Sequence, residues 1–282
     1  MKIDTIILSG GSSKGISFLG TFNYLIENQY IDRDLKNIKK IICVSASFLF
    51  TLMILFHESD FIQMKKDMLD FNFVDFLDIN DISLKNLFNN YGLINKNKNH
   101  IYIKKLLKEK YNKENLSLLS LYKKTNIHII VKVSNITKKK IEYIDHINNP
   151  KINILKLIQM TTAMPIIFQP VKYKNDIYID GGLCGNLPIE INDSVDYLSI
   201  DILGGNDENI NNIFDYLSKL YWMYTPDTIM RKYDIKNIKL NLDELNIDLT
   251  DFNLNKDIKN KLIDMGYEQA KKHFNDYSAS SI

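Results

Sequence analysis

The sequence predicts an α/β protein with a mostly parallel central sheet. Short apolar runs rich in β-branched residues alternate with longer segments of helical periodicity. The first two of these runs are each followed by a loop of small residues and then by a helical pattern, which is the element order of a parallel α/β sheet. The chain has 282 residues, and 45% of them are hydrophobic, which is enough for the core of such a domain.

The amino-terminal part supplies two strand–loop–helix units. Residues 5–8 are a continuous apolar run, as expected for a strand buried on both faces, and residues 16–27 carry apolar side chains at helical spacing. Residues 38–44 predict a second strand, and residues 48–57 predict a second helix. The region of residues 61–121 carries helical patterns without a convincing strand pair and predicts a helical insertion.

The carboxyl-terminal part predicts further strands and helices. We expect strands at residues 126–135, 141–144, 176–179, 197–203 and 238–242, and helices at residues 154–162 and 256–274. No internal repeat and no linker rich in Pro, Gly or Ser divides the chain. We therefore expect a single domain, residues 1–282, with a core of residues 3–205, a helical insert of residues 58–121 and a helical extension of residues 206–276.

Composition excludes several function classes. The formal net charge is +2, from 36 Lys and Arg against 34 Asp and Glu, so neither a nucleic-acid binder nor an acidic tail is indicated. Cys43 and Cys184 alone cannot build a disulfide framework or a thiolate zinc site, and a reducing compartment is the simpler interpretation. The amino-terminal apolar run is too short for a signal peptide, and no apolar segment reaches the roughly 18 residues of a membrane span. We expect an intracellular protein, either cytoplasmic or peripheral at a membrane.

Three stretches of small or polar residues follow predicted strands, where ligand sites of open α/β sheets lie. The first is SGGSSKG, residues 9–15. Its glycines Gly10 and Gly11 let the backbone approach a ligand closely, and amides before a helix start form an anion-binding surface. Neither the dinucleotide fingerprint nor the phosphate-loop motif is matched. A glycine turn with a solvated Lys14 is the alternative interpretation.

The second stretch is CVSAS, residues 43–47, between a predicted strand and a predicted helix. This is the layout of a nucleophile elbow with Ser45 at its centre, but Cys43 and Ser47 occupy the positions of the two glycines of G-x-S-x-G. The elbow lifts the serine out of the sheet and places it at a helix amino terminus. A buried serine turn is the alternative, and Ser47 is the competing nucleophile.

The third stretch is Asp180-Gly181-Gly182, which lies far beyond Ser45 in the sequence. A carboxylate near a serine hydroxyl can act as a general base if burial raises its pKa toward neutrality. A simple β-turn is the alternative. Only the fold can decide, because it alone brings the two residues together.

In this order the three stretches resemble the patatin-like phospholipases, which share a core with the catalytic domains of cytosolic phospholipase A2. The first block of that family reads LSGGSSKGISFLG here, with Gly20 in place. The second block, G-x-S-x-G, reads CVSAS, and the third, A-x-x-x-P-x-x-F-x-P into D-G-G, reads TTAMPIIFQPVKYKNDIYIDGGLCGNLP. The resemblance covers residues 3–200 and is weakest in residues 58–121.

The resemblance implies a three-layer α/β/α fold and a lipid acyl hydrolase with a Ser-Asp dyad and no catalytic histidine. It implies Ser45 as nucleophile, Asp180 as general base, and the amides of Gly10, Gly11 and Ser12 as the oxyanion hole. No metal and no cofactor is implied. Lys14 could contact a lipid phosphate, although a salt bridge or a helix cap is an equal alternative. None of the histidines lies in a recognisable catalytic setting in the sequence: His57, His100, His128, His146 and His273.

Two functions from other classes compete with hydrolysis. The altered elbow, with Cys43, Ala46 and Ser47 around Ser45, favours a catalytically weak protein of the same fold that binds lipid or a partner. The loop of residues 9–15 alone would suit a phosphate-binding α/β protein, which would not need the third block. A lipid substrate implies a transient membrane surface, and the candidate contacts are Phe71, Phe73, Phe76 and the lysines of residues 138–140. Ordinary helix core and a solvated hairpin turn are the respective alternatives.

Overall fold

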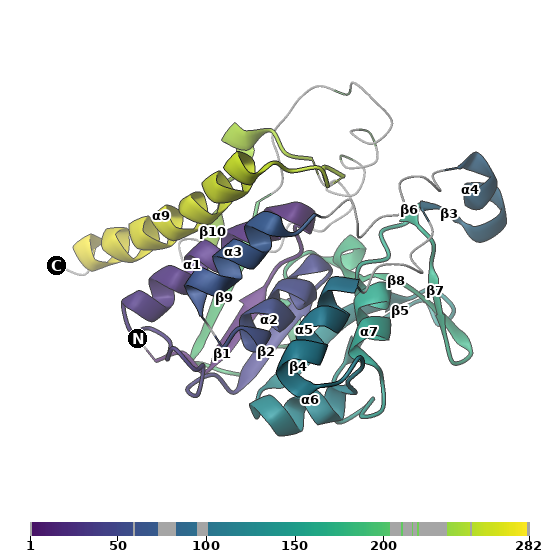
Figure 1. Cartoon of the computed structure of the whole chain (residues 1–282), viewed down its shortest axis with the longest axis horizontal. Coiled ribbons are helices and arrows are strands. Elements are labelled where there is room, and N and C mark those ends of the chain that lie inside the picture. The colour runs from purple at the N-terminus through teal and green to yellow at the C-terminus, as the bar shows by residue number, and fades with distance from the viewer. Residues whose placement is uncertain are drawn as a thin grey trace.

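The computed structural model describes residues 2–58, 60–72, 83–94, 101–203, 210, 216, 219, 236–248 and 250–280. Within them an eight-stranded sheet, flanked by helices, has the strand order β10-β9-β1-β2-β4-β8-β7, with β5 paired to β4 (Figure 1). The strands are β1 Thr5–Leu8, β2 Lys40–Val44, β4 His128–Asn135, β5 Lys140–Ile144, β7 Val171–Tyr173, β8 Asp176–Asp180, β9 Tyr197–Ile202 and β10 Asn237–Leu240. The expected mostly parallel α/β architecture is confirmed, because β10, β9, β1, β2 and β4 are joined by parallel pairs.

The described helices account for most of the remaining chain. They are α1 Ser17–Glu27, α2 Ala46–Phe56, α3 Phe61–Asp70, α4 Leu84–Asn90, α5 Ile101–Tyr111, α6 Leu118–Thr125, α7 Ile154–Thr161 and α9 Lys256–Ser280. The first helix begins later than predicted, because a 3-10 helix, η1 Ser12–Ile16, precedes it. Helix α9 lies along α1 (Figure 1), and the two backbones are so close that a Cβ on Gly20 would stand 1.8 Å from the carbonyl oxygen of Ile263. Each of the described helices is too short or too polar to cross a bilayer.

Alternate residues of the central strands pack on the two faces of the sheet. Ile6 and Ile41 join the large core with the helices, whereas Ile7, Ile42 and Ile130 pack against the segment that contains Leu187. This alternation is the two-residue period of a strand, and it explains why both faces of each run are apolar in sequence.

The predicted insert departs from expectation. A short strand, β3 Gly92–Ile94, pairs in parallel with β6 Ile166–Phe168 and forms a second, two-stranded sheet. The described part of the helical insert therefore also contains a strand that was not expected, because such short strands leave no periodic pattern to detect. Phe71 is buried and its ring lies 4.6 Å from that of Tyr102, which favours ordinary core. Phe73 and Phe76 lie outside the described residues.

Strands β2 and β8 share one edge of β4. Strand β4 pairs with β2 through residues 128–132, with β8 through residues 133–135 and with β5 through residues 131–135. The residues that pair with β5 therefore overlap both of the other sets. Because a strand has only two edges, β5 takes one edge, and β2 and β8 divide the other. They run toward each other and end opposite neighbouring residues of β4, with Val44 beside Lys132 and Asp180 beside Val133.

This junction corrects one premise of the sequence argument. The Asp180 stretch does follow a strand, but that strand is antiparallel to β4, so its end does not lie at the carboxyl edge by the rule for parallel strands. The residue after Val44 and the last residue of β8 meet because two opposed strands abut.

Candidate active site

Ser45 occupies the sharp turn between β2 and α2. Its backbone has φ 57° and ψ −134°, an uncommon conformation for a residue with a side chain. The Ser45 N–H donates to Thr161 Oγ1 at 2.8 Å, and the Thr161 hydroxyl donates to the Lys132 carbonyl at 2.9 Å. Helix α7 and strand β4 therefore hold the strained turn in place, as at other functional turns.

The Ser45 hydroxyl points at a carboxylate. Ser45 Oγ donates to Asp180 Oδ2 at 2.6 Å, the length of a hydrogen bond to a charged acceptor. The other oxygen, Oδ1, accepts the N–H of Gly182 at 2.8 Å, and the N–H of Asp180 donates to the Ala163 carbonyl at 3.0 Å. Asp180 is buried at 1% exposure, so its side chain is fixed with one oxygen toward the serine and one toward the following loop.

The glycine loop lies directly beside the serine. A Cβ on Gly10 would stand 3.2 Å from Ser45 Cβ and 2.5 Å from Asn186 Oδ1, so the loop can come this close only with glycine. Asn186 forms two hydrogen bonds with Gly10. The Asn186 carbonyl accepts the Gly10 N–H at 3.1 Å, and Asn186 Nδ2 donates to the Gly10 carbonyl at 3.0 Å. Of the three predicted oxyanion amides, that of Gly10 is thus already engaged. Gly11 and Ser12 lie at the start of η1.

The two departures from the elbow motif are accommodated differently. Cys43 packs in the core with its Sγ 3.6 Å from the Ile130 carbonyl, and burial raises the pKa of its thiol. Ser47 is fully buried and bonds back to the strand, because its Oγ accepts the Val44 N–H at 2.9 Å and lies 2.6 Å from the Val44 carbonyl. In the described contacts, Ser47 therefore has a structural role, and Ser45 is the serine that bonds to the carboxylate of Asp180.

Lys14 lies inside the protein rather than at the surface. It is 3% exposed, and burial lowers the pKa of its ammonium group, while Asp243, Asp248 and Asp251 oppose that shift. These carboxylates belong to the segment before α9, near the other end of the sequence. The surroundings favour the charge-pair alternative over a contact with a lipid phosphate.

Three supporting residues escaped the sequence analysis: Thr161, Asn186 and Lys132. Lys132 is fully buried in β4, and its Nζ donates to the carbonyls of Cys184 at 3.1 Å and Gly185 at 2.9 Å and to Glu190 Oε1 at 2.6 Å. It anchors the loop that carries Asn186. A lysine within the apolar run HIIVKVSN was the available signal, because a charge in a buried strand requires partners.

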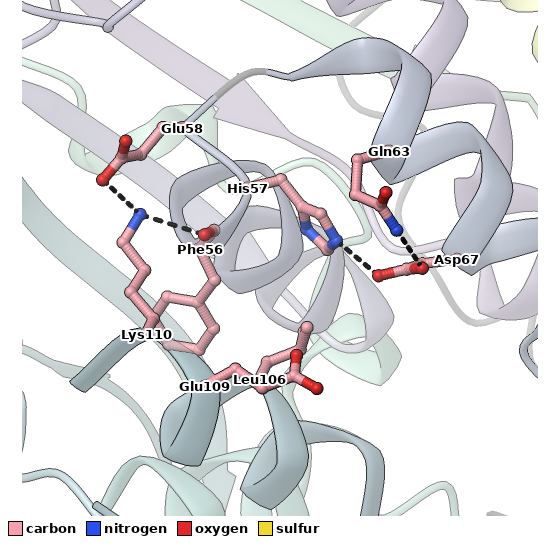
Figure 2. A pocket seen from close by; sticks show the side chains of 8 residues that line it. All are labelled: Phe56, His57, Glu58, Gln63, Asp67, Leu106, Glu109 and Lys110. Carbon is pink, nitrogen blue, oxygen red and sulfur yellow. Dashed lines mark hydrogen bonds and ion pairs between the residues drawn. The ribbon is translucent and has the colours of Figure 1, made fainter. Parts of the chain in front are cut away.

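A pocket of about 370 Å³ lies at the other end of α2, about 16 Å along the helix from Ser45 (Figure 2). His57 contributes one ring nitrogen 2.9 Å from Asp67 Oδ2 and the other 2.8 Å from the Met53 carbonyl. Lys110 pairs with Glu58 at 2.9 Å. These pairs join α2, α3 and α5, and the His57–Asp67 pair is too distant to serve Ser45.

Comparisons with known proteins found a matching family, related sequences and a similar fold. The sequence model of the patatin-like phospholipase family matches residues 6–193. A protein of Acanthamoeba polyphaga mimivirus is 25% identical over 96% of this chain and 93% of its own length. A probable lipid hydrolase of Invertebrate iridescent virus 6 is 25% identical over 66% of this chain and 62% of its own. The crystal structure of VipD from Legionella pneumophila superposes with a TM-score of 0.58 at 17% identity, covering 98% of this chain and 67% of that one.

Proposed function

Because this chain belongs to the patatin-like phospholipase family, we propose that it is a lipid acyl hydrolase of the phospholipase A or lysophospholipase type, with Ser45 as nucleophile and Asp180 as general base. The observation that carries the proposal is the 2.6 Å hydrogen bond from Ser45 Oγ to Asp180 Oδ2. It joins two residues that are distant in the sequence, at a turn of the nucleophile-elbow type. The probable lipid hydrolase among its relatives is consistent with a lipid substrate.

The reaction follows from the placement of these groups. Asp180 accepts the hydroxyl proton as Ser45 Oγ attacks the carbonyl carbon of an acyl ester, and the carbonyl oxygen becomes an oxyanion. The proton then passes from Asp180 to the departing alcohol, which leaves an acyl group on Ser45. Water, deprotonated by Asp180, attacks the carbonyl carbon of this acyl-enzyme, and Asp180 then returns the proton to Ser45 Oγ as the bond to the acyl group breaks, which releases the fatty acid and the free serine.

The oxyanion needs donors on the side of the serine that faces the glycine loop. We place the backbone amides of Gly10, Gly11 and Ser12 on that side, and the amide of Gly10 donates to the Asn186 carbonyl in the described structure. A single such donor is worth roughly 3–4 kcal/mol of transition-state stabilisation. The contacts of Asn186 with Gly10 on both sides of the peptide keep this loop against Ser45.

The competing function is a lipid-binding protein of the same fold without hydrolysis. It rests on Cys43 and Ser47 in place of the elbow glycines. The contact between Ser45 and Asp180 argues against it, because this hydrogen bond is present together with both substitutions.

Covalent labelling with a fluorophosphonate, read by mass spectrometry, tests the proposal. We expect labelling at Ser45 in the wild type, none in Ser45→Ala, and at least about 100-fold slower labelling in Asp180→Asn, since a general base contributes at least that factor. Ser47→Ala is the matched control and keeps the label. Well-folded wild type that stays unlabelled would favour the lipid-binding alternative, and a label on Ser47 would relocate the nucleophile. A screen of phospholipids and lysophospholipids then identifies the ester.

A further inference from the structure

Helix α4 carries apolar side chains on an uncovered surface. None of its residues is buried, and Leu84 and Phe88, four positions apart on one helical face, are 68% and 78% exposed. Tyr91, which ends the helix in a left-handed conformation, is 71% exposed. Figure 1 shows α4 and β3 at the opposite end of the molecule from the carboxyl end of α9.

The apolar surface continues onto the strand that β3 pairs with. Gly92 is the register partner of Ile166, which is 41% exposed although it belongs to β6. Ile166 also has φ 72°, an outlier for a β-branched residue. Scattered exposed apolar residues are ordinary, but a contiguous group of this kind marks an interaction surface. We call residues 83–94 and 165–174 the α4 lobe.

The charge of the α4 lobe selects among partners. Its two segments contain three lysines, Lys85, Lys172 and Lys174, and no aspartate or glutamate, whereas the whole chain nearly balances its charges. All three lysines are exposed, and Lys174 Nζ lies 5.3 Å from the centre of the Tyr173 ring. Segments that carry exposed apolar side chains together with lysines and tyrosines suit the interface of a bilayer with anionic lipids.

The lobe is also connected to the dyad. Strand β6 begins shortly after Ala163, whose carbonyl accepts the Asp180 N–H. Its residues Ile167 and Phe168 pack with Ile94 and Met164 in a small apolar cluster. A surface bound through α4 is therefore tied by a short backbone path to the residue that faces Ser45.

We propose that the α4 lobe docks this protein onto bilayers that contain anionic lipids, with Leu84, Phe88 and Tyr91 entering the interface and the three lysines facing the headgroups. The inference rests on the proposed function only in that the bilayer would hold the ester substrate. Of the sequence-based candidates, it leaves out Phe71, which is buried, and it adjoins the lysines of residues 138–140, since Lys138 pairs with Asp176 two positions beyond Lys174.

Vesicle co-sedimentation tests the proposal in the Ser45→Ala background, where hydrolysis cannot alter the vesicles. Phosphatidylcholine vesicles with and without phosphatidylglycerol are compared. We expect binding that favours the anionic vesicles, at least tenfold weaker binding for Leu84→Ser with Phe88→Ser, and about fivefold weaker binding for each of Lys172→Gln and Lys174→Gln. The matched control is Ile62→Ser, which removes an apolar side chain on α3 that is 82% exposed, and it keeps wild-type binding.

Each other outcome overturns the proposal. Equal binding by the serine double variant and its parent would place the membrane contact elsewhere, and an equal loss in Ile62→Ser would mean that no specific surface is used. A protein that stays in the supernatant with every vesicle would make another protein the occupant of this face. Circular dichroism and the unfolding midpoint check that the surface variants fold, since such changes cost less than about 0.5 kcal/mol. Failure to hydrolyse lipids would not affect this binding measurement.

Discussion

Replacing Ser47 by the glycine of the family motif should destabilise this protein. The Ser47 hydroxyl is buried and bonds to the Val44 amide and carbonyl, and it lies 3.3 Å from the Leu8 carbonyl. Taking a partner from buried backbone groups costs about 1–3 kcal/mol. Because Ser47 is the second residue of α2, glycine there costs about 0.5–1 kcal/mol more than alanine. The Ser47→Gly variant should therefore lose about 1.5–4 kcal/mol of unfolding free energy, and Ser47→Ala about 1–3 kcal/mol.

The assay is thermal and urea unfolding of wild type, Ser47→Ala and Ser47→Gly, with fluorophosphonate labelling of each. A loss of about 1 kcal/mol lowers the unfolding midpoint by about 2–4 °C in a protein of this size. Both variants should still be labelled at Ser45, since the hydroxyl of Ser47 does not touch Asp180 in the described structure. A Ser47→Gly variant as stable as the wild type would refute the reasoning, because the hydroxyl would then be dispensable in the turn.

Three further changes probe the surroundings of the dyad. Lys132→Met should lower the unfolding free energy by about 3 kcal/mol, because it removes the buried cation that holds the loop after Gly182. The exposed control Lys140→Met should lower it by no more than about 0.5 kcal/mol, and chemical denaturation compares the two variants. Thr161→Val should lower kcat about tenfold with a smaller change in KM, and Thr161→Ser should restore it; steady-state kinetics would contradict a positioning role if both variants matched the wild type. Burial raises the pKa of Asp201 from its usual 3.8 to about 6, so the stability that its protonated form contributes is complete below about pH 4 and is lost as pH rises through 6. Asp201→Asn should then raise the unfolding midpoint at pH 7.5 but not at pH 4, and equal shifts at both would exclude this linkage.

The sequence was most informative for segments that are buried along their whole length, because these appear as continuous apolar runs. Strands β1, β2 and β4 are apolar on both faces because both faces are covered, and the runs at residues 5–8, 38–44 and 126–135 show this directly. The elbow was located between a strand and a helix although its glycines are absent. The local strand–turn–helix pattern, together with its position between the two other family blocks, therefore predicted where Ser45 lies.

What could not be predicted depends on distant contacts. The β3–β6 pair joins segments that are far apart in the sequence, and neither strand is long enough to show a period. Lys14 was open to interpretation as a solvated side chain because the aspartates that face it come near the other end of the sequence. Asn186 was part of a quoted motif, but no function was assigned to it, because its hydrogen bond to Gly10 forms only once the sheet is assembled.

The opposed ends of β2 and β8 on β4 also bear on how the protein is made. Ser45 is synthesised early, whereas Asp180, its proposed general base, arrives much later and pairs with the part of the β4 edge that β2 leaves open. A nascent chain that has exposed only its first two strand–helix units therefore has a serine but no base. Such long-range pairing is slow to form, because the chain closes a long loop before the contact stabilises it. Under the proposed mechanism, esterase activity would thus report completed assembly of the sheet, and a ribosome-bound intermediate would lack that activity.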